Sequence, residues 1–236
     1  MKIATKNRET MVNYRRFFWI YLFFLFTWFL GISGESNAAE EKRLLLVTGC
    51  ARSGTAYIAK VLTRAGLQFG HESMRRDGLS CWTMTVESNW SPWGPLRKNI
   101  KFAHIFHQIR DPLKTISSVY SREPPVSWKY IMEHVPEIHE DDSRLVKSAK
   151  YWYYWNLKAA KIAEWSYRIE DLPEVWEELQ ERLAINLDGT GLKEVPTNTN
   201  TCGNYTRKVT WEDLKKELTP AFYGQVRKLA ASYKYL

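Results

Sequence analysis

The chain has 236 residues, of which 44% are hydrophobic and 25% charged, and its net charge is +8. This composition excludes a disordered chain, a collagen and a coiled coil, and the length suffices for one ordinary domain with a sizeable core. Three cysteines are too few for a disulfide scaffold. The first 32 residues contribute +4 of the net charge, so the rest carries a mild excess, which suits an anionic ligand better than a nucleic-acid coat.

An uncharged apolar segment, Phe17–Ile32, follows Arg15 and Arg16 near the start of the chain. As a helix its 16 residues span roughly 24 Å, a little less than the hydrocarbon core of a bilayer. We expect an uncleaved single-pass anchor. The alternative is a signal peptide cleaved after Ala38, where small residues surround the cut. A buried core helix is disfavoured, because the segment has no polar face.

The segment divides the chain into residues 1–39, a stub with the anchor or signal peptide, and a domain over residues 40–236. More positive charge precedes the segment than follows it, which favours a cytoplasmic N-terminus and a domain across the membrane. Signal cleavage leads instead to an exported domain. Whether Cys81 and Cys202 pair or stay reduced is open.

Strand and helix patterns alternate from residue 43 onward. The apolar run Arg43–Thr48 is typical of a strand buried on both faces, and a loop from Gly49 to Gly54 leads into helical spacing over Thr55–Ala65. The later elements are expected in this order: strand Leu67–Gly70, an irregular stretch 73–98, strand Lys101–Ile109, a helix opened by Pro112, a helix over 143–165, strand Tyr167–Ile169, helix Pro173–Leu183, a polar loop 188–208 and two C-terminal helices. This alternation predicts an α/β fold with a mostly parallel sheet that binds ligands at the carboxyl ends of its strands.

The loop Gly49-x4-Gly54 has the form of a phosphate cradle, because loop N–H groups and the following helix N-terminus attract anions. A nucleotide triphosphatase has lysine directly after the second glycine, where this chain has Thr55. The basic residue, Arg52, lies inside the loop instead. Phosphoryl transfer from ATP normally needs Mg²⁺, and no apolar strand of this chain ends in an Asp placed to bind that ion. A sulfuryl group carries less charge than a triphosphate and can be transferred with protein cations alone. The alternative is a glycine-rich turn without a ligand.

A second motif lies at the end of the strand Lys101–Ile109. Arg110 directly follows this strand, and Ser118 lies eight residues later, two turns into the next helix. An arginine fork and a hydroxyl brought together in this way suit a second, separate phosphate.

The two motifs together resemble the sulfotransferase family. Cys50–Ala56 is similar to the family's 5′-phosphosulfate loop, and Arg110 with Ser118 matches its 3′-phosphate motif, 58 residues beyond Arg52. The segment Tyr167–Leu172 is similar to the Glu-Asp-Leu segment that follows a core strand in many members. Either motif alone is weak, but both in this order are fairly specific.

The resemblance implies a three-layer, P-loop-like α/β fold that uses 3′-phosphoadenosine-5′-phosphosulfate (PAPS) as donor, without a metal. Arg110 and Ser118 would hold the 3′-phosphate, and Arg52 would stabilise charge on the leaving phosphate oxygen. Five consecutive residues would hold the 5′-phosphosulfate: Arg52, Ser53, Gly54, Thr55 and Ala56.

The chain departs from the cytosolic members of that family. They have lysine where Arg52 stands, which brings this chain closer to the membrane-bound and bacterial branches. Ile169 stands where they carry an aromatic residue against the adenine, and Arg207 with Lys208 is a loose substitute for their Arg-Lys-Gly clamp.

An acceptor hydroxyl must lose a proton during transfer, so a base is expected near the phosphosulfate. Glu72 follows the second strand, 20 residues beyond Arg52, and its context is similar to that of the general base in protein-tyrosine sulfotransferases. We take Glu72 as the base, with His71 as an alternative. If Glu72 is not the base, its alternative role is structural, as a loop residue that pairs with Arg75 or Arg76.

Two groups are expected mainly in the core, with the alternative that one ring of the aromatic run faces the acceptor. His104 and His107 alternate along an apolar strand, and Tyr151–Trp155 lies within the long helix. No cluster of residues has the spacing of a zinc site, so no metal is expected.

The irregular stretch 73–98 supplies tryptophans and cations: Arg75, Arg76, Trp82, Trp90, Trp93, Arg97 and Lys98. Indole faces suit sugar rings and cations suit an acidic glycan, but the three tryptophans would equally cover the core.

These features predict a PAPS-dependent sulfotransferase whose acceptor hydroxyl belongs to a carbohydrate, associated with a membrane and not with nucleic acid. The rival hypotheses are a P-loop small-molecule kinase and a non-catalytic anion- or glycan-binding protein of the same fold.

Overall fold

The computed structural model describes residues 42–199 and 206–236, so the predicted anchor or signal segment and Cys202 lie outside the described residues. Within the described part, no helix is both long and apolar enough to cross a membrane. Cys50 and Cys81 are buried free thiols.

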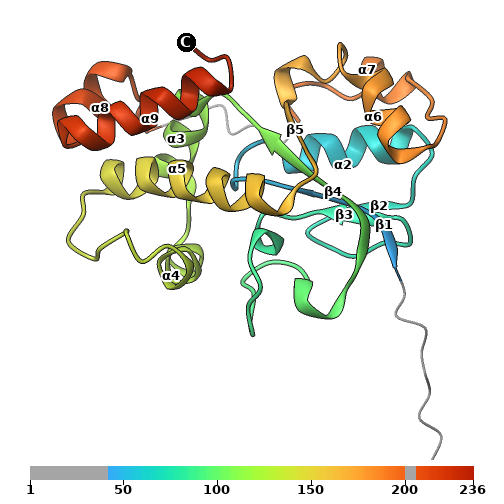
Figure 1. Ribbon diagram of the computed structural model, residues 1–236, viewed down its shortest axis with the longest axis horizontal. Helices are drawn as coiled ribbons and strands as arrows, with labels where there is room; N and C mark the ends of the chain where they lie inside the picture. The colour runs from blue at the N-terminus through green and yellow to red at the C-terminus, as the bar shows by residue number, and fades with distance from the viewer. Residues whose placement is uncertain (1–41, 200–205) are drawn as a thin grey trace, which may run out of the picture. The chain divides into compact units, whose positions relative to one another are not determined.

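Five strands form one sheet in the order β2-β3-β1-β4-β5 (Figure 1). Their bounds are β1 Arg43–Thr48, β2 Phe69–His71, β3 Gly78–Ser80, β4 Phe102–Ile109 and β5 Trp165–Arg168. All pairings between these strands are parallel. The predicted α/β fold with a mostly parallel sheet is confirmed.

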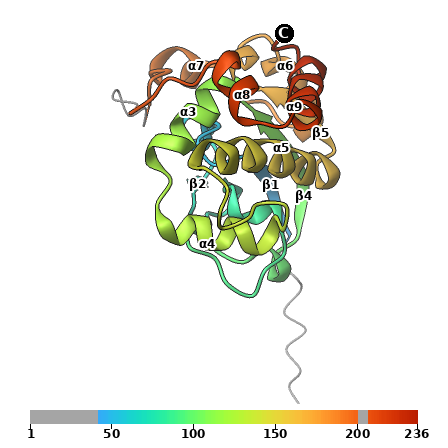
Figure 2. The ribbon, with the colours of Figure 1, turned by 90° about the vertical axis from the view of Figure 1, so that its left-hand side faces the viewer.

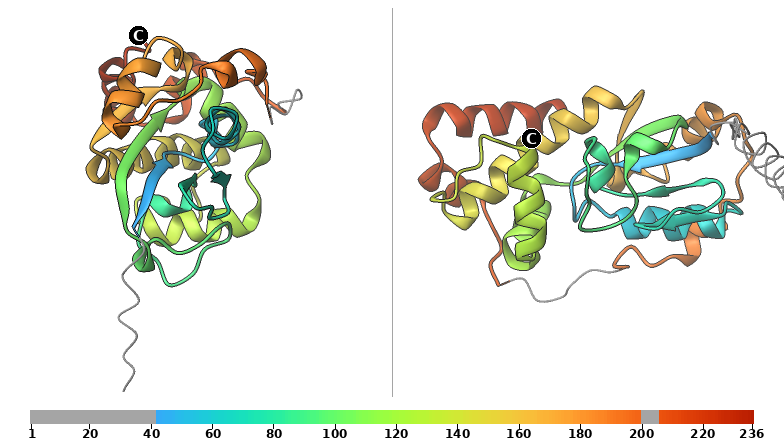
Figure 3. Two further views of the ribbon diagram at one scale, coloured as in Figure 1. Left: turned by 90° about the vertical axis from the view of Figure 1, so that its right-hand side faces the viewer. Right: turned by 90° about the horizontal axis from the view of Figure 1, so that it is seen from below.

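Helices cover both faces of the sheet, which gives three layers (Figure 3). On one face lie α2 Thr55–Arg64, α6 Trp176–Leu183 and α7 Thr190–Glu194. Ile58, Val61 and Leu62 recur at helical spacing along α2 and are fully buried there. The apolar stripe read from the sequence therefore packs α2 onto the sheet.

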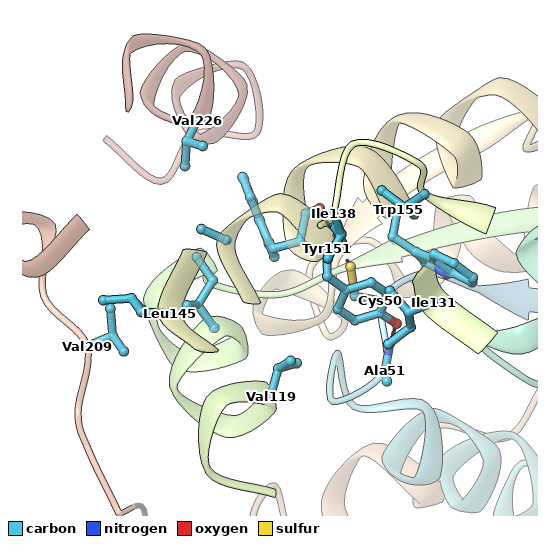
Figure 4. Packing of buried hydrophobic residues seen from close by; sticks show 14 of the residues in the cluster. Cys50, Ala51, Val119, Ile131, Ile138, Leu145, Tyr151, Trp155, Val209 and Val226 are labelled. Carbon is cyan, nitrogen blue, oxygen red and sulfur yellow. Dashed lines mark hydrogen bonds between the residues drawn. The ribbon is translucent and has the colours of Figure 1, made fainter. Parts of the chain in front are cut away.

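A second set of helices gathers on the opposite side around a shared apolar core (Figure 2). These are α3 Pro112–Arg122, α4 Pro125–His134, α5 Arg144–Ile162, α8 Trp211–Glu217 and α9 Pro220–Ser232. Tyr151 and Trp155 of α5 are fully buried, and the core reaches Cys50 and Ala51 of the loop after β1 (Figure 4). The prediction that this aromatic run is mainly packing is confirmed.

The two strand histidines differ in their surroundings. His107 is fully buried between Asn156 and Ser166, and burial lowers its pKa to about 4, so it is a neutral core residue as predicted. His104 is partly exposed, and its Nδ1 lies 2.7 Å from Glu164.

The connections that leave the carboxyl ends of β1 and β4 lead toward opposite edges of the sheet. The two strands are neighbours, with Thr48 opposite His107. From β1 the chain runs through α2 to β2 at one edge of the sheet, and from β4 it runs through α3, α4 and α5 to β5 at the other. Open α/β sheets bind ligands at such a switch point.

The stretch 73–98 is less irregular than predicted, because it contains β3 and two short 3₁₀ helices, Thr83–Thr85 and Arg97–Asn99. β3 has three residues, too few for a periodic signal. It begins at Gly78, where a Cβ would lie 1.8 Å from the Leu45 oxygen, so only glycine allows β3 to lie against β1 here.

Candidate active site

A cavity of about 660 Å³ opens at the switch point, beside the loop that follows β1. Residues from this loop, from α3 and from the segments after β2 and β5 line it. Most of the predicted site residues are among them: Arg52, Gly54, Thr55, Ala56, Glu72, Arg110 and Ser118. The two motifs and the predicted base therefore share one space.

The loop between β1 and α2 depends on glycine at both ends. A Cβ at Gly49 would lie 2.3 Å from the backbone oxygen of Gln108, so glycine is needed for β4 to approach. Gly54 precedes α2 with a φ of 94°, and Arg52 adopts a φ of 71°. A non-glycine residue in the left-handed region is typical of functional loops.

The Ser53 hydroxyl lies inside this loop, 3.4 Å from the position that a Cβ of Gly49 would occupy. It is buried and has no hydrogen-bond partner among the described residues. A buried hydroxyl without a partner costs free energy, and the oxygen of a bound anion would remove that cost. In this respect the loop fits a phosphosulfate group.

Three side chains from the surrounding core hold the loop. The Tyr151 hydroxyl accepts a hydrogen bond from Ala51 N at 2.7 Å. Gln108 Nε2 donates to the backbone carbonyl oxygen of Ser53 at 2.7 Å, and the Tyr167 hydroxyl donates to Gln108 Oε1 at 2.8 Å. Sequence reasoning did not predict these contacts, because each of the three residues lies far from the loop in the chain.

We expect Tyr151→Phe to lower the free energy of unfolding by about 1–3 kcal/mol, because the buried Ala51 N–H loses its acceptor. Urea unfolding of the variant and the parent chain measures this loss. Tyr153→Phe, at a partly buried position of the same helix, is the matched control and is expected to cost less. Equal losses in the two variants would contradict the assigned contact.

The phosphate loop and the second motif meet through direct hydrogen bonds. Arg52 Nε donates to Ser118 Oγ at 3.0 Å, and Arg110 Nη1 donates to the Arg52 oxygen at 3.0 Å. Asp111 caps α3 by accepting from Lys114 N, with Pro112 in the first turn, which brings Ser118 round to the loop. Arg52, Arg110 and Ser118, which were predicted to hold two separate groups of the donor, are thus in direct contact in the structure.

Glu72 and His71 lie close to Arg52 and Thr55. His71 Nε2 lies 3.2 Å from Thr55 Oγ1 and 3.9 Å from Glu72 Oε1. Burial and the nearby charge of Arg52 lower the pKa of His71, so its ring is neutral at pH 7. Burial, followed by the charge of Glu123, raises the pKa of Glu72, which suits a carboxylate that must accept a proton.

Glu123 is a cavity residue that sequence reasoning missed. It follows α3 and is 6% exposed, and burial raises the pKa of its carboxyl. No motif or spacing marks it, because only the packing of α3 and α4 places it in the same cavity as Glu72. Within residues 42–199 and 206–236, no three His, Cys, Asp or Glu side chains are grouped as metal ligands.

The tryptophan and arginine stretch divides between the cavity and the surface. Trp82 and Trp93 line the cavity, and Trp82 is also part of the core. The cations of the stretch have other partners: Arg76 pairs with Asp77, Arg97 with Glu87, and Lys98 donates to Asn89. Trp90 does not line the cavity and donates to Glu133 instead. Two of the three tryptophans therefore border the site, and these cations do not line it.

Arg207 does not line this cavity in the described part of the chain. Its guanidinium lies 2.5 Å from Asp213 and 3.6 Å from Glu217, and it packs over the ring of Tyr120. Two carboxylates of α8 thus hold the side chain that was predicted to bind the donor. Ile169, by contrast, lines the cavity beside Gly54.

No known family profile and no curated protein matches the chain. Among solved structures, a sulfotransferase domain from the curacin biosynthetic pathway is similar, with 11% identity, a TM-score of 0.43 and coverage of 83% of this chain and 98% of that one. The mouse sulfotransferase SULT7A1 complexed with PAP is similar with 13% identity, a TM-score of 0.37 and coverage of 82% and 84%. At these values neither likeness assigns an activity to this chain.

Proposed function

We propose that this protein transfers the sulfuryl group of PAPS to an acceptor hydroxyl. The observation that carries the proposal is the convergence of Arg52, Arg110 and Ser118 with Glu72 around one cavity. Two sets of anion-binding groups suit a donor that has phosphates at two positions. A raised-pKa carboxylate beside them suits proton removal from the acceptor.

In the proposed reaction the acceptor oxygen attacks the sulfur of PAPS and forms the new S–O bond. The bond between sulfur and the bridging phosphate oxygen breaks, and the products are a sulfate ester and adenosine 3′,5′-bisphosphate. Glu72 takes the proton of the acceptor hydroxyl. Arg52 and the N–H groups at the start of α2 stabilise the charge that develops on the leaving phosphate oxygen.

We further propose a carbohydrate acceptor and a single membrane anchor in residues 1–39. The indole rings of Trp82 and Trp93 at the cavity support the first, because flat aromatic faces suit sugar rings. The uncharged segment Phe17–Ile32 supports the second.

The donor is tested by calorimetric titration of the full chain, kept in mild detergent, with adenosine 3′,5′-bisphosphate and separately with ATP plus Mg²⁺. Micromolar binding of the bisphosphate without a response to ATP is the expected result. Binding of Mg-ATP alone would replace this proposal with a small-molecule kinase. Binding of neither nucleotide would refute donor binding and favour a protein that only binds anions or glycans.

A further inference from the structure

The cavity has two chemically different ends, and this inference about its acceptor end rests on the proposed function. Arg52, Arg110 and Ser118 form the donor end. Glu72, Glu123, Trp82 and Trp93 line the same cavity, and the charge of Arg52 reaches both carboxylates and partly offsets the rise in their pKa. Two carboxylates and two indoles thus lie in the cavity beside the donor motif.

Each carboxylate is linked to an indole, Glu72 directly and Glu123 through Ser127. A hydrogen bond from Trp82 to the Glu72 carboxylate partly offsets the burial that raises the pKa of Glu72. Ser127 Oγ accepts from Trp93 Nε1 at 3.0 Å, and Ser127 in turn hydrogen-bonds the Glu123 carboxylate, which partly offsets the raised pKa of that group. The acidic groups and the rings are therefore parts of one hydrogen-bonded wall.

Trp93 is the outer part of this wall. It is 41% exposed, whereas Trp82 is 2% exposed and fills the floor. A Cβ at Gly94 would lie 3.0 Å from the backbone oxygen of Glu72, so the segment that carries Trp93 lies against the backbone at Glu72.

The charges of the side chains that line the cavity determine which acceptors bind there. The basic side chains that line the cavity are Arg52, Arg110, Lys114 and Arg122, and in the proposed function the anionic groups of the donor engage Arg52 and Arg110. Arg144 also acts on Glu123, but it does not line the cavity. Once the donor engages Arg52, the negative charges of Glu72 and Glu123 set the potential beside it. An anionic acceptor is then repelled, and a cationic one is attracted.

We propose that the acceptor carries an ammonium group near its reacting hydroxyl, as an amino sugar or an ammonium alcohol does, and that Glu123 with the Trp82 and Trp93 rings binds this group. An ammonium group is attracted electrostatically to the face of an indole ring as well as to a carboxylate. Glu123 binds the cation, and Glu72 remains available for the hydroxyl proton. An amino sugar also satisfies the carbohydrate proposal above.

The test uses choline and 3,3-dimethylbutan-1-ol, which have the same shape but differ in charge. Each is titrated into the full chain saturated with adenosine 3′,5′-bisphosphate, and tryptophan fluorescence reports binding. We expect choline to bind at least about tenfold more tightly than the neutral alcohol. Glucosamine against N-acetylglucosamine is a second pair with the same expected direction.

Glu123→Gln keeps the shape of the side chain and removes its charge, so we expect it to abolish most of the choline preference. Glu133→Gln is the matched control, because Glu133 lies on α4, binds Trp90 Nε1 and does not line the cavity. Bisphosphate affinity within about threefold of the parent chain shows that Glu123→Gln is folded.

The possible failures are distinguishable. Equal binding of the two probes, tighter binding of the neutral alcohol, or no binding of either to the bisphosphate-loaded chain overturns this inference and leaves the proposed function intact. A preference for choline that survives in Glu123→Gln overturns the role of Glu123. Failure of the bisphosphate itself to bind overturns the proposed function, and this inference with it.

Discussion

Arg110→Ala is expected to weaken the binding of adenosine 3′,5′-bisphosphate by about a hundredfold or more. The variant loses a charge-assisted contact to the 3′-phosphate, and such contacts are stronger than neutral hydrogen bonds. It also loses the hydrogen bond from Arg110 Nη1 to the Arg52 oxygen, which helps to set the loop conformation. Both losses act on the same ligand, so their effects combine. Calorimetric titration measures the affinity.

Two further variants separate charge from geometry in that experiment. Arg110→Lys keeps the charge but not the planar fork, and an intermediate loss is expected. Arg182→Ala is the control, because Arg182 is paired with Glu178 on the surface of α6. An affinity in Arg110→Ala that equals that of the parent chain would remove the 3′-phosphate site from this motif.

Glu72→Gln is expected to lower kcat by about 10²- to 10⁴-fold, the usual contribution of a general base, while bisphosphate affinity stays within a few-fold. The amide has the same shape as the carboxylate but accepts no proton from the acceptor. Steady-state kinetics with PAPS and an acceptor that the chain sulfates measures kcat, and calorimetry measures donor-product binding. Full activity in Glu72→Gln would assign the proton to another group.

The pH dependence follows from the raised pKa of Glu72. The ionised form is the base, so activity is lost as pH falls through this raised pKa. The charge of Glu123 contributes to the raised pKa, and its removal in Glu123→Gln is expected to move the acid limb of kcat/KM to lower pH. An unmoved or higher acid limb would show that the two carboxylates are not coupled.

The same raised pKa has a consequence for stability. A carboxyl whose pKa is higher in the folded chain than its usual 4.5 costs folding free energy above the folded pKa, and the cost disappears below the unfolded one. Glu72→Gln is therefore expected to have a higher Tm than the parent chain at pH 7. The difference closes as pH falls through the folded pKa toward 4.5. Thermal unfolding at several pH values checks the sign.

Much of the fold is readable from the sequence, because short-range patterns specify it. The run Arg43–Thr48 is a strand with the predicted bounds, and the helix after the loop begins at Thr55 as predicted. Glycine at both ends of the loop and Pro112 after Arg110 are local features whose conformational effects do not depend on distant residues. A three-residue strand such as β3 has no such pattern.

Local sequence patterns were enough to predict the glycine-bounded loop, the Arg110 and Ser118 motif and the position of Glu72 after a strand. Each of the three depends on residues that are neighbours in the chain. The contacts of Tyr151 and Gln108 with the loop, the proximity of Glu123 to Glu72 and the pairing of Arg207 with α8 depend on the tertiary structure. These contacts join residues far apart in the chain, and packing of α3, α5 and α8 brings them together, which no local spacing encodes.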